Sequence, residues 1–203
     1  MPISMKNEAA IAGIGMTRFS KNSGVSELSL ACEAINNCLD DAGLDPKEVD
    51  GLVTYTLDSN DEVEVARAVG MGDLTMYAKI NYGGGAAVGL IQQAVMAVAT
   101  GAAKNVVVWR AMNGRSGQRM GQGVSGDIIS SDLIHWSWYQ VYGMLTPGSW
   151  IAMIAHKYMN KYGVTAEDLG RVAVSQRNYA LTNPRAFGYQ KPLTMEQYLS
   201  SKM

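Results

Sequence analysis

Residues 76–111 read MYAKINYGGGAAVGLIQQAVMAVATGAAKNVVVWRA, and this stretch decides the fold class. A short apolar run, 76–81, precedes three consecutive glycines, and a longer segment of small and apolar residues, 86–100, follows them up to Gly101. The stretch closes with 105–111, which is rich in valine. Short apolar runs of this kind are typical of buried strands, whereas the longer segment predicts a helix. The stretch therefore predicts a strand, a helix and a second strand.

The residues before this unit predict a helix. Ser26 is suited to cap its start, apolar residues recur at helical spacing up to Ala42, and Gly43 is suited to end it in the left-handed conformation. Asp45-Pro46 then predicts a single helical turn, because proline fits the first helical position.

Strands and helices alternate along the rest of this region. Residues 8–15 (EAAIAGIG) and 51–56 (GLVTYT) predict two more strands, and 62–69 predicts a short helix. Strands that alternate with helices indicate a layered α/β fold, with a largely parallel sheet covered by helices on its faces.

The character of the chain changes after Ala111. The stretch 113–132 is rich in glycine, serine and asparagine, and a helix is predicted at 150–162. Thr165 and Asp168 form the pattern of a capping box for another helix, which Asn183-Pro184 ends. We therefore expect an α/β part at 1–112 and a partly helical part at 113–203.

Composition excludes several classes of protein. The 203 residues are 47% hydrophobic and carry 17 basic and 18 acidic side chains, so there is no basic surplus for nucleic acid or anionic lipid and too much apolar content for disorder. No apolar run is long enough to span a bilayer, and the first residues lack the apolar core of a secretion signal. We expect a cytoplasmic globular protein with no membrane span and no nucleic-acid partner.

Neither the cysteines nor the histidines indicate a metal site. Cys32 and Cys38 lie six residues apart on one predicted helix without a CxxC pattern, which predicts reduced core thiols. His135 has no acidic partner or second ligand nearby in the sequence. We expect no bound metal.

The glycine triplet Gly83-Gly84-Gly85 is the first candidate site. Residues without a β-carbon permit a sharp turn and close approach of a ligand, and the following helix would offer its free N–H groups there. Equally, the glycines could only let the helix pack tightly on the sheet. Neither GxGxxG nor GxxxxGK[ST] is matched, so nucleotide binding is not indicated.

Longer motifs resemble a known family. They are IAGIG (11–15), SELSLACEAINNCLDDAGLDPKEVDGLVTYT (26–56), INYGGGAAVGLIQQAVMAVATGAAKNVVVWRAMNGRSG (80–117) and YMNKYGVTAEDLGRVAVSQRNYALTNPRAF (158–187). Together they resemble the N-terminal part of thiolase-superfamily proteins, in the bacterial lipid-transfer-protein branch related to the sterol carrier protein X thiolases. That branch includes aldolases of steroid side-chain degradation. The resemblance implies a thiolase-like α/β half at 1–112, a loop domain at 113–203 and an absent C-terminal half.

The resemblance also implies a changed reaction. Counted back from AVATG, the position of the thiolase nucleophilic cysteine falls on Gly84, which cannot form an acyl-thioester intermediate. What remains, beside Gly83 and Gly85, is a helix start suited to stabilise a thioester enolate. This favours retro-aldol cleavage of an acyl-CoA steroid side chain into a 17-ketosteroid and propionyl-CoA.

Further site residues follow from the same resemblance. Tyr82 would place its hydroxyl in the pocket; alternatively, it only packs at the end of a strand. Asn113 lies about where thiolases carry a glutamate near the active site; alternatively, it only forms a turn. Tyr142, Met144 and Thr146 fall near the thiolase segment that lines the acyl-CoA channel, with an aromatic packing cluster as the alternative. The acid–base tyrosines of the family belong to the absent half.

The resemblance implies a CoA thioester as substrate, no tightly bound cofactor, a homodimer and an OB-fold, zinc-ribbon partner chain. Two alternatives stay open: acyl transfer or thiolysis with another nucleophile, and a non-catalytic lipid or acyl-CoA carrier. A single α/β half would leave apolar surface uncovered, so the 203 residues alone are expected to associate and to be inactive.

Overall fold

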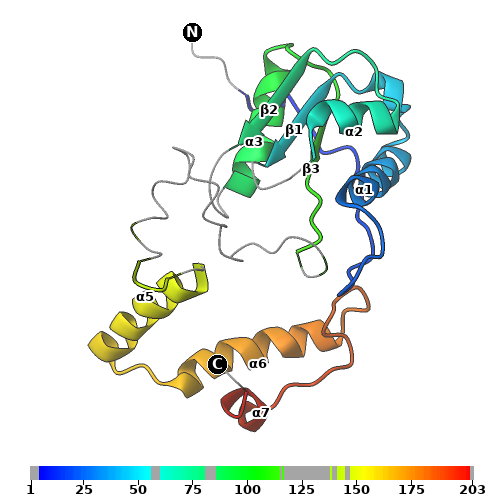
Figure 1. Ribbon diagram of the computed structural model, residues 1–203. Coiled ribbons are helices and arrows are strands. Elements are labelled where there is room, and N and C mark those ends of the chain that lie inside the picture. The colour runs from blue at the N-terminus through cyan, green and yellow to red at the C-terminus, as the bar shows by residue number, and fades with distance from the viewer. Residues whose placement is uncertain are drawn as a thin grey trace. The chain divides into compact units, whose positions relative to one another are not determined.

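The structure is a computed structural model that describes residues 5–55, 60–80, 86–114, 116, 138, 141–144 and 147–201. The chain divides into two compact units, residues 1–119 and 120–203, and each is described by itself. Figure 1 shows the helices and strands of both units.

A parallel sheet forms the centre of the first unit. Its strands are β1 (Gly51–Tyr55), β2 (Met76–Ile80) and β3 (Val106–Trp109), in the order β2-β1-β3 (Figure 1). Every residue of β1 is buried because it lies between the other two, whereas burial alternates along β2. These three strands and their parallel arrangement confirm the prediction from the sequence.

Helices cover both faces of this sheet. On one face lie α1 (Glu27–Ala42) and α2 (Glu62–Val69), which contact each other; on the other lies α3 (Ala86–Ala99), which contacts all three strands. Alternate residues of a strand point to opposite faces. Accordingly Leu52 joins the core against α1 and α2, while its neighbour Val53 joins the core against α3. All three helices were predicted, with matching bounds within one residue.

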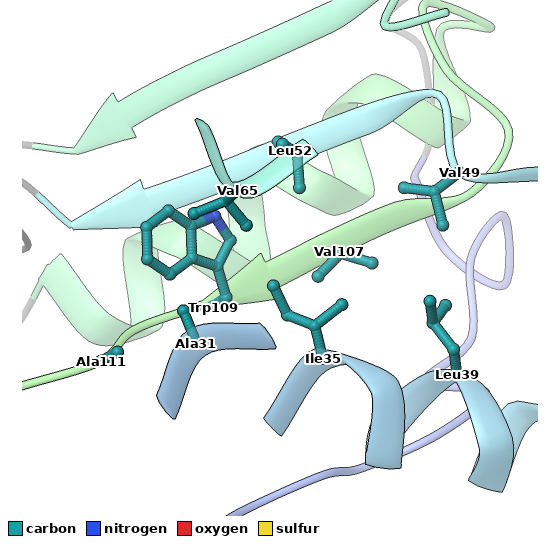
Figure 2. Close-up of a cluster of buried hydrophobic side chains, with 9 residues drawn as sticks. All are labelled: Ala31, Ile35, Leu39, Val49, Leu52, Val65, Val107, Trp109 and Ala111. Atoms are coloured by element: carbon teal, nitrogen blue, oxygen red, sulfur yellow. The ribbon is translucent and has the colours of Figure 1, made fainter. Parts of the chain in front are cut away.

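The larger core lies between the sheet and α1. Figure 2 shows Ile35 and Leu39 of α1 directed toward the strands, with the Trp109 ring beside Val65 of α2. Buried residues of this cluster are Ala31, Ile35, Leu39, Val49, Leu52, Val65, Val107, Trp109 and Ala111. This packing fixes the position at which the chain leaves β3, which matters for the site described below.

Local capping sets the ends of α1 as the sequence predicts. The Ser26 side chain accepts a hydrogen bond from the Ser29 amide, and Gly43 has a φ of 66°, the left-handed conformation. Asp45 and Glu48 then form a capping box around the 3-10 turn η1 (Pro46–Glu48).

Asp50 ties the amino ends of the three strands together. Its carboxylate accepts hydrogen bonds from the amides of Lys104 and Asn105 at 2.9–3.0 Å, just before β3. Its carbonyl accepts one from the Thr75 amide at 2.8 Å, just before β2. With the amino ends aligned in this way, the carboxyl ends of the strands meet at the opposite edge of the sheet.

The strand predicted at 8–15 is wrong. The described residues of this segment pair with no strand; they run beside α1, whose side chains satisfy the backbone instead. Asp41 accepts from the Ile14 amide at 2.9 Å, and the Cys38 thiol donates to the Gly13 carbonyl at 3.3 Å. A β-carbon at Gly13 would lie 2.5 Å from the Cys38 carbonyl oxygen, so the close approach depends on glycine.

The described part of the second unit contains three assigned helices: α5 (Pro147–Tyr162), α6 (Ala166–Leu181) and α7 (Met195–Leu199). The capping box of Thr165 and Asp168 starts α6 as predicted, and the hydrogen bonds from Thr165 lower the pKa of the Asp168 carboxyl. Helix α7 was not predicted. Across the described ranges of both units, no helix has the length and apolar character needed to cross a bilayer.

Candidate functional site

The carboxyl ends of the three strands form the edge at which a site is expected. In open α/β sheets, ligands bind beyond the carboxyl ends of parallel strands. Here β1 ends at Tyr55, β2 at Ile80 and β3 at Trp109. Tyr82, Gly83, Gly84 and Gly85 fall between β2 and α3 in the sequence but lie outside the described residues. Their role therefore stays a prediction.

Asn113 lies just beyond β3 and is held at both ends of its amide. Its Oδ1 accepts a hydrogen bond from the Ser23 hydroxyl at 2.6 Å, and its Nδ2 donates to the Val25 carbonyl at 2.9 Å. Its backbone amide donates to the Glu27 carboxylate at 2.8 Å. These contacts join the segment before α1 to the segment after β3, and we call this connection the Asn113 joint. Both polar groups of the Asn113 side chain are used in it.

A pocket of about 460 Å³ opens beside this joint, and we call it the β3 pocket. Its walls come from residues 15–21 and 23, from α1, and from 110–114 and 116. Arg18, Lys21, Ser23, Leu30, Arg110 and Asn113 are among the residues that line it. The volume lies within the range of roughly 300–1,000 Å³ usual for small-molecule sites.

Arg110 is positioned by an aromatic ring rather than by an acid. Its guanidinium carbon lies 4.8 Å from the ring centroid of the buried Tyr55, a cation–π geometry. Lys79, on β2, differs: its ammonium lies 3.3 Å from Glu62 and 3.6 Å from Asp61. The cation of β2 is thus paired with acids within the fold, whereas Arg110 has no ion pair among the described residues.

The β3 pocket could not be predicted from the sequence. Arg18 and Arg110 are 92 positions apart, and no motif joins them. The sequence indicates only one of these residues as a site candidate. Arg110 directly follows a predicted strand, and residues at that position lie at the ligand-binding edge of a parallel sheet.

The remaining candidates belong to the second unit. Tyr142 is 78% exposed and Met144 is half-buried, while Thr146 lies outside the described residues. The structure describes the two units separately, so a common site of these residues with Asn113 stays a prediction.

The two cysteines of α1 are free and half-buried. Burial raises the pKa of the Cys32 thiol; burial, together with the nearby Asp41 carboxylate, raises the pKa of the Cys38 thiol. Both therefore hold their protons more firmly than an ordinary cysteine, and the protonated thiol is not the nucleophilic form. Among the described residues, no three histidine, cysteine or acidic side chains gather as a metal site would require.

Comparisons with known proteins agree on one group. The chain is 53% identical over 196 residues to the steroid side-chain-cleaving aldolase of Thermomonospora curvata, which covers 96% of the chain and 50% of that protein. It is 50% identical over 200 residues to the 17-hydroxy-3-oxo-4-pregnene-20-carboxyl-CoA lyase of Mycobacterium tuberculosis, covering 98% of the chain and 52% of that protein. The chain thus spans about half the length of the curated relatives it matches. No protein-family model matches it.

Solved structures give the same picture of the fold. A structure named Ltp2-ChsH2(DUF35) aldolase is 52% identical, with a TM-score of 0.85 over 96% of the chain and 49% of its own chain. An SCP2-thiolase-like protein of Mycobacterium smegmatis matches with a TM-score of 0.61 and 21% identity, over 95% of the chain and 39% of its own. At that identity the second match supports a thiolase-like fold and nothing finer.

Proposed function

We propose that the chain, as a homologue of the steroid side-chain aldolases with a thiolase-like fold, forms part of an acyl-CoA retro-aldolase. The proposed substrate is a 17-hydroxy steroid with a CoA-activated side chain, and the products are a 17-ketosteroid and propionyl-CoA. The observation that carries the proposal is the identity of 50–53% over nearly the whole chain to proteins named as such an aldolase and lyase.

The proposed reaction is a carbon–carbon cleavage without net oxidation. A base takes the proton of the C17 hydroxyl, the C17–O bond becomes the ketone, and the C17–C20 bond breaks. Its electron pair enters the thioester as an enolate, which an oxyanion site stabilises and an acid protonates on carbon. The proton balance closes, so no cofactor is consumed, and CoA takes part only as the thioester of the substrate.

In this proposal the segment between β2 and α3 supplies the enolate site. Gly84 occupies the position of the thiolase cysteine, with Gly83 and Gly85 beside it and Tyr82 before it. Tyr142, Met144 and Thr146 line the acyl-CoA channel. Asn113 is proposed at the edge of the site; its bonds to Ser23 and Val25 support a positioning role there.

Acyl transfer is the competing reaction, since two acetyl-CoA acetyltransferases also match, at 27% and 25% identity over about half of their lengths. That chemistry forms a covalent intermediate on an activated nucleophile. Cys32 and Cys38 are poor candidates because burial raises the pKa of both thiols. The Cys38 thiol, moreover, donates to the Gly13 carbonyl within the fold. These observations favour cleavage without a covalent ester.

The partners and the location are part of the proposal. The Ltp2-ChsH2(DUF35) structure supports a second chain, for which we propose an OB-fold, zinc-ribbon protein. We also propose a homodimer, in the cytoplasm.

The test is a cleavage assay on the full polypeptide that carries this chain, with and without the partner chain. Incubation with a 17-hydroxy-3-oxo-4-pregnene-20-carboxyl-CoA substrate should release a 17-ketosteroid and propionyl-CoA in equal amounts, measured by liquid chromatography and mass spectrometry. The C32S/C38S variant should retain this activity. An acyl adduct on either cysteine, or no ketone with the partner present, would reject the proposal; acyl-CoA binding without turnover would favour a carrier.

A further inference from the structure

The β3 pocket concentrates positive charge in a chain whose net charge is −1. Three cationic residues are among those that line it, Arg18, Lys21 and Arg110, and no aspartate or glutamate is among its described lining residues. Within the described part of the chain, Arg18 and Lys21 form no ion pair. A concave surface of one charge sign attracts ligands of the opposite sign.

The walls of the pocket suit a compact anion. Leu30 and Ala34 of α1 are apolar lining residues, which weakens screening by water, and Thr17 and Ser20 are hydroxyl-bearing ones. The Glu27 carboxylate, the acid that approaches this region through Asn113, accepts the Asn113 amide and does not line the pocket.

Arg110 is oriented for a ligand in advance. The cation–π contact with the Tyr55 ring restrains the position of the guanidinium. Among the described residues, its guanidinium forms one hydrogen bond, a weak one from Nη2 to the Met112 sulfur at 3.7 Å. A planar fork of N–H donors held in this way matches the oxygen atoms of a phosphate group.

From this arrangement we propose that the β3 pocket binds a phosphate group, with Arg18, Lys21 and Arg110 as its cationic contacts. One source of that group is the nucleotide end of CoA, and this assignment rests on the proposed function. The other source is a free phosphate or a different phosphorylated metabolite. The phosphate chemistry is common to both, and the experiment separates them.

The test compares two matched double variants of the full polypeptide by isothermal titration calorimetry. R18Q/K21Q removes two charges from the pocket; R67Q/K47Q removes the same two residue types at exposed positions, on α2 and on the turn η1 before β1. The probes are CoA, dephospho-CoA, adenosine 3′,5′-bisphosphate and inorganic phosphate. Thermal unfolding of both variants checks that they fold.

We expect R18Q/K21Q to weaken binding of a phosphate probe by roughly tenfold or more, with reduced sensitivity to salt, and R67Q/K47Q to bind as the wild type does. Weaker binding of CoA and the bisphosphate, with dephospho-CoA unchanged, identifies the 3′-phosphate of CoA. Weaker binding of inorganic phosphate alone identifies a free phosphate. Equal affinity of both variants for every probe, or no binding at all, overturns the proposal.

This outcome is independent of the cleavage assay. If the wild type cleaves the steroid substrate while R18Q/K21Q binds every probe normally, the proposal of a phosphate site in the β3 pocket is wrong and the proposed function stands. If phosphate binding depends on Arg18 and Lys21 but no ketone forms under any condition, the proposed function fails and the site remains.

Discussion

Asn113 shows how a single side chain can join distant parts of the chain. It links the loop before α1 to the end of β3 through Ser23 and Val25, which lie 90 and 88 positions away. The joint forms one wall of the β3 pocket. Because the same atoms serve both the fold and the edge of the site, a change at Asn113 should alter stability before it alters chemistry.

We predict that N113A lowers the free energy of unfolding of the first unit by about 2 kcal/mol, since two hydrogen bonds are lost, a partly buried one with Ser23 and an exposed one with Val25. S23A should cost about 1 kcal/mol. Because Ser23 and Asn113 share a bond, the double variant should cost about as much as N113A alone, and not the sum. Urea unfolding followed by circular dichroism measures all three variants.

The control is N36A, at an exposed position of α1 where the side chain forms no hydrogen bond with the described residues; because alanine favours a helix more than asparagine does, N36A should keep or slightly raise the midpoint. If the double variant loses the sum of the unfolding free energies lost by S23A and N113A, the two residues act separately and the hydrogen bond between them does not stabilise the fold.

Residues whose partners are local could be predicted, and those with distant partners could not. Ser26, Gly43 and the Thr165–Asp168 pair cap their helices with groups three or four positions away, so the sequence alone indicates them. The bond from Ser23 to Asn113, and the presence of both Arg18 and Arg110 around the β3 pocket, depend on how the sheet brings separate segments together. Nothing in the local sequence records such pairs.

At the scale of elements, composition predicted every strand that lies between covering helices. It failed for residues 8–15, because apolar composition shows that a segment is suited to a sheet but not that a strand is free to pair with it. The Ile14 amide and the Gly13 carbonyl found partners on α1 instead. Helix α7 was missed for the opposite reason: five residues, Met195–Leu199, are too few to show helical periodicity.

Gly170 determines how closely α7 approaches α6. A β-carbon there would lie 2.6 Å from the Met195 sulfur and 2.7 Å from the Tyr198 ring. We predict that G170A stabilises α6 by up to about 1 kcal/mol through helix propensity and loses a similar amount or more, about 1–3 kcal/mol, through overpacking. The net change in unfolding free energy should be small or unfavourable, while hydrogen exchange in α7 becomes faster.

N178A is the matched substitution on an exposed position of α6, where added helix propensity meets no neighbour in α7. Its α7 amides should exchange at the wild-type rate. Unchanged exchange of α7 in G170A would mean that Met195 and Tyr198 move aside at no cost, and that the close contact does not hold α7 in place.

At the scale of the whole molecule, both units of the chain leave large apolar side chains exposed to solvent. In the first unit Ile11 is 76% and Ile14 is 77% exposed, on the segment that failed to form a strand. In the second, Ile151 and Ile154 of α5 are 62% and 65% exposed. The chain spans about half of its curated relatives, and an apolar surface of this kind is typical of one that another segment or subunit covers.

We therefore predict that the purified 203-residue chain associates with itself. Its mass by light scattering should rise above 21.8 kDa as the concentration increases, because contact between copies removes the exposed apolar groups from water. The I11K/I14K variant should shift this rise to higher concentration, since charge opposes both apolar contact and edge-to-edge strand pairing. V63K, which changes one isolated exposed side chain on α2, should not. A constant monomer mass at every concentration would mean that these side chains are not a docking surface, and that the two units cover their apolar faces without any further chain.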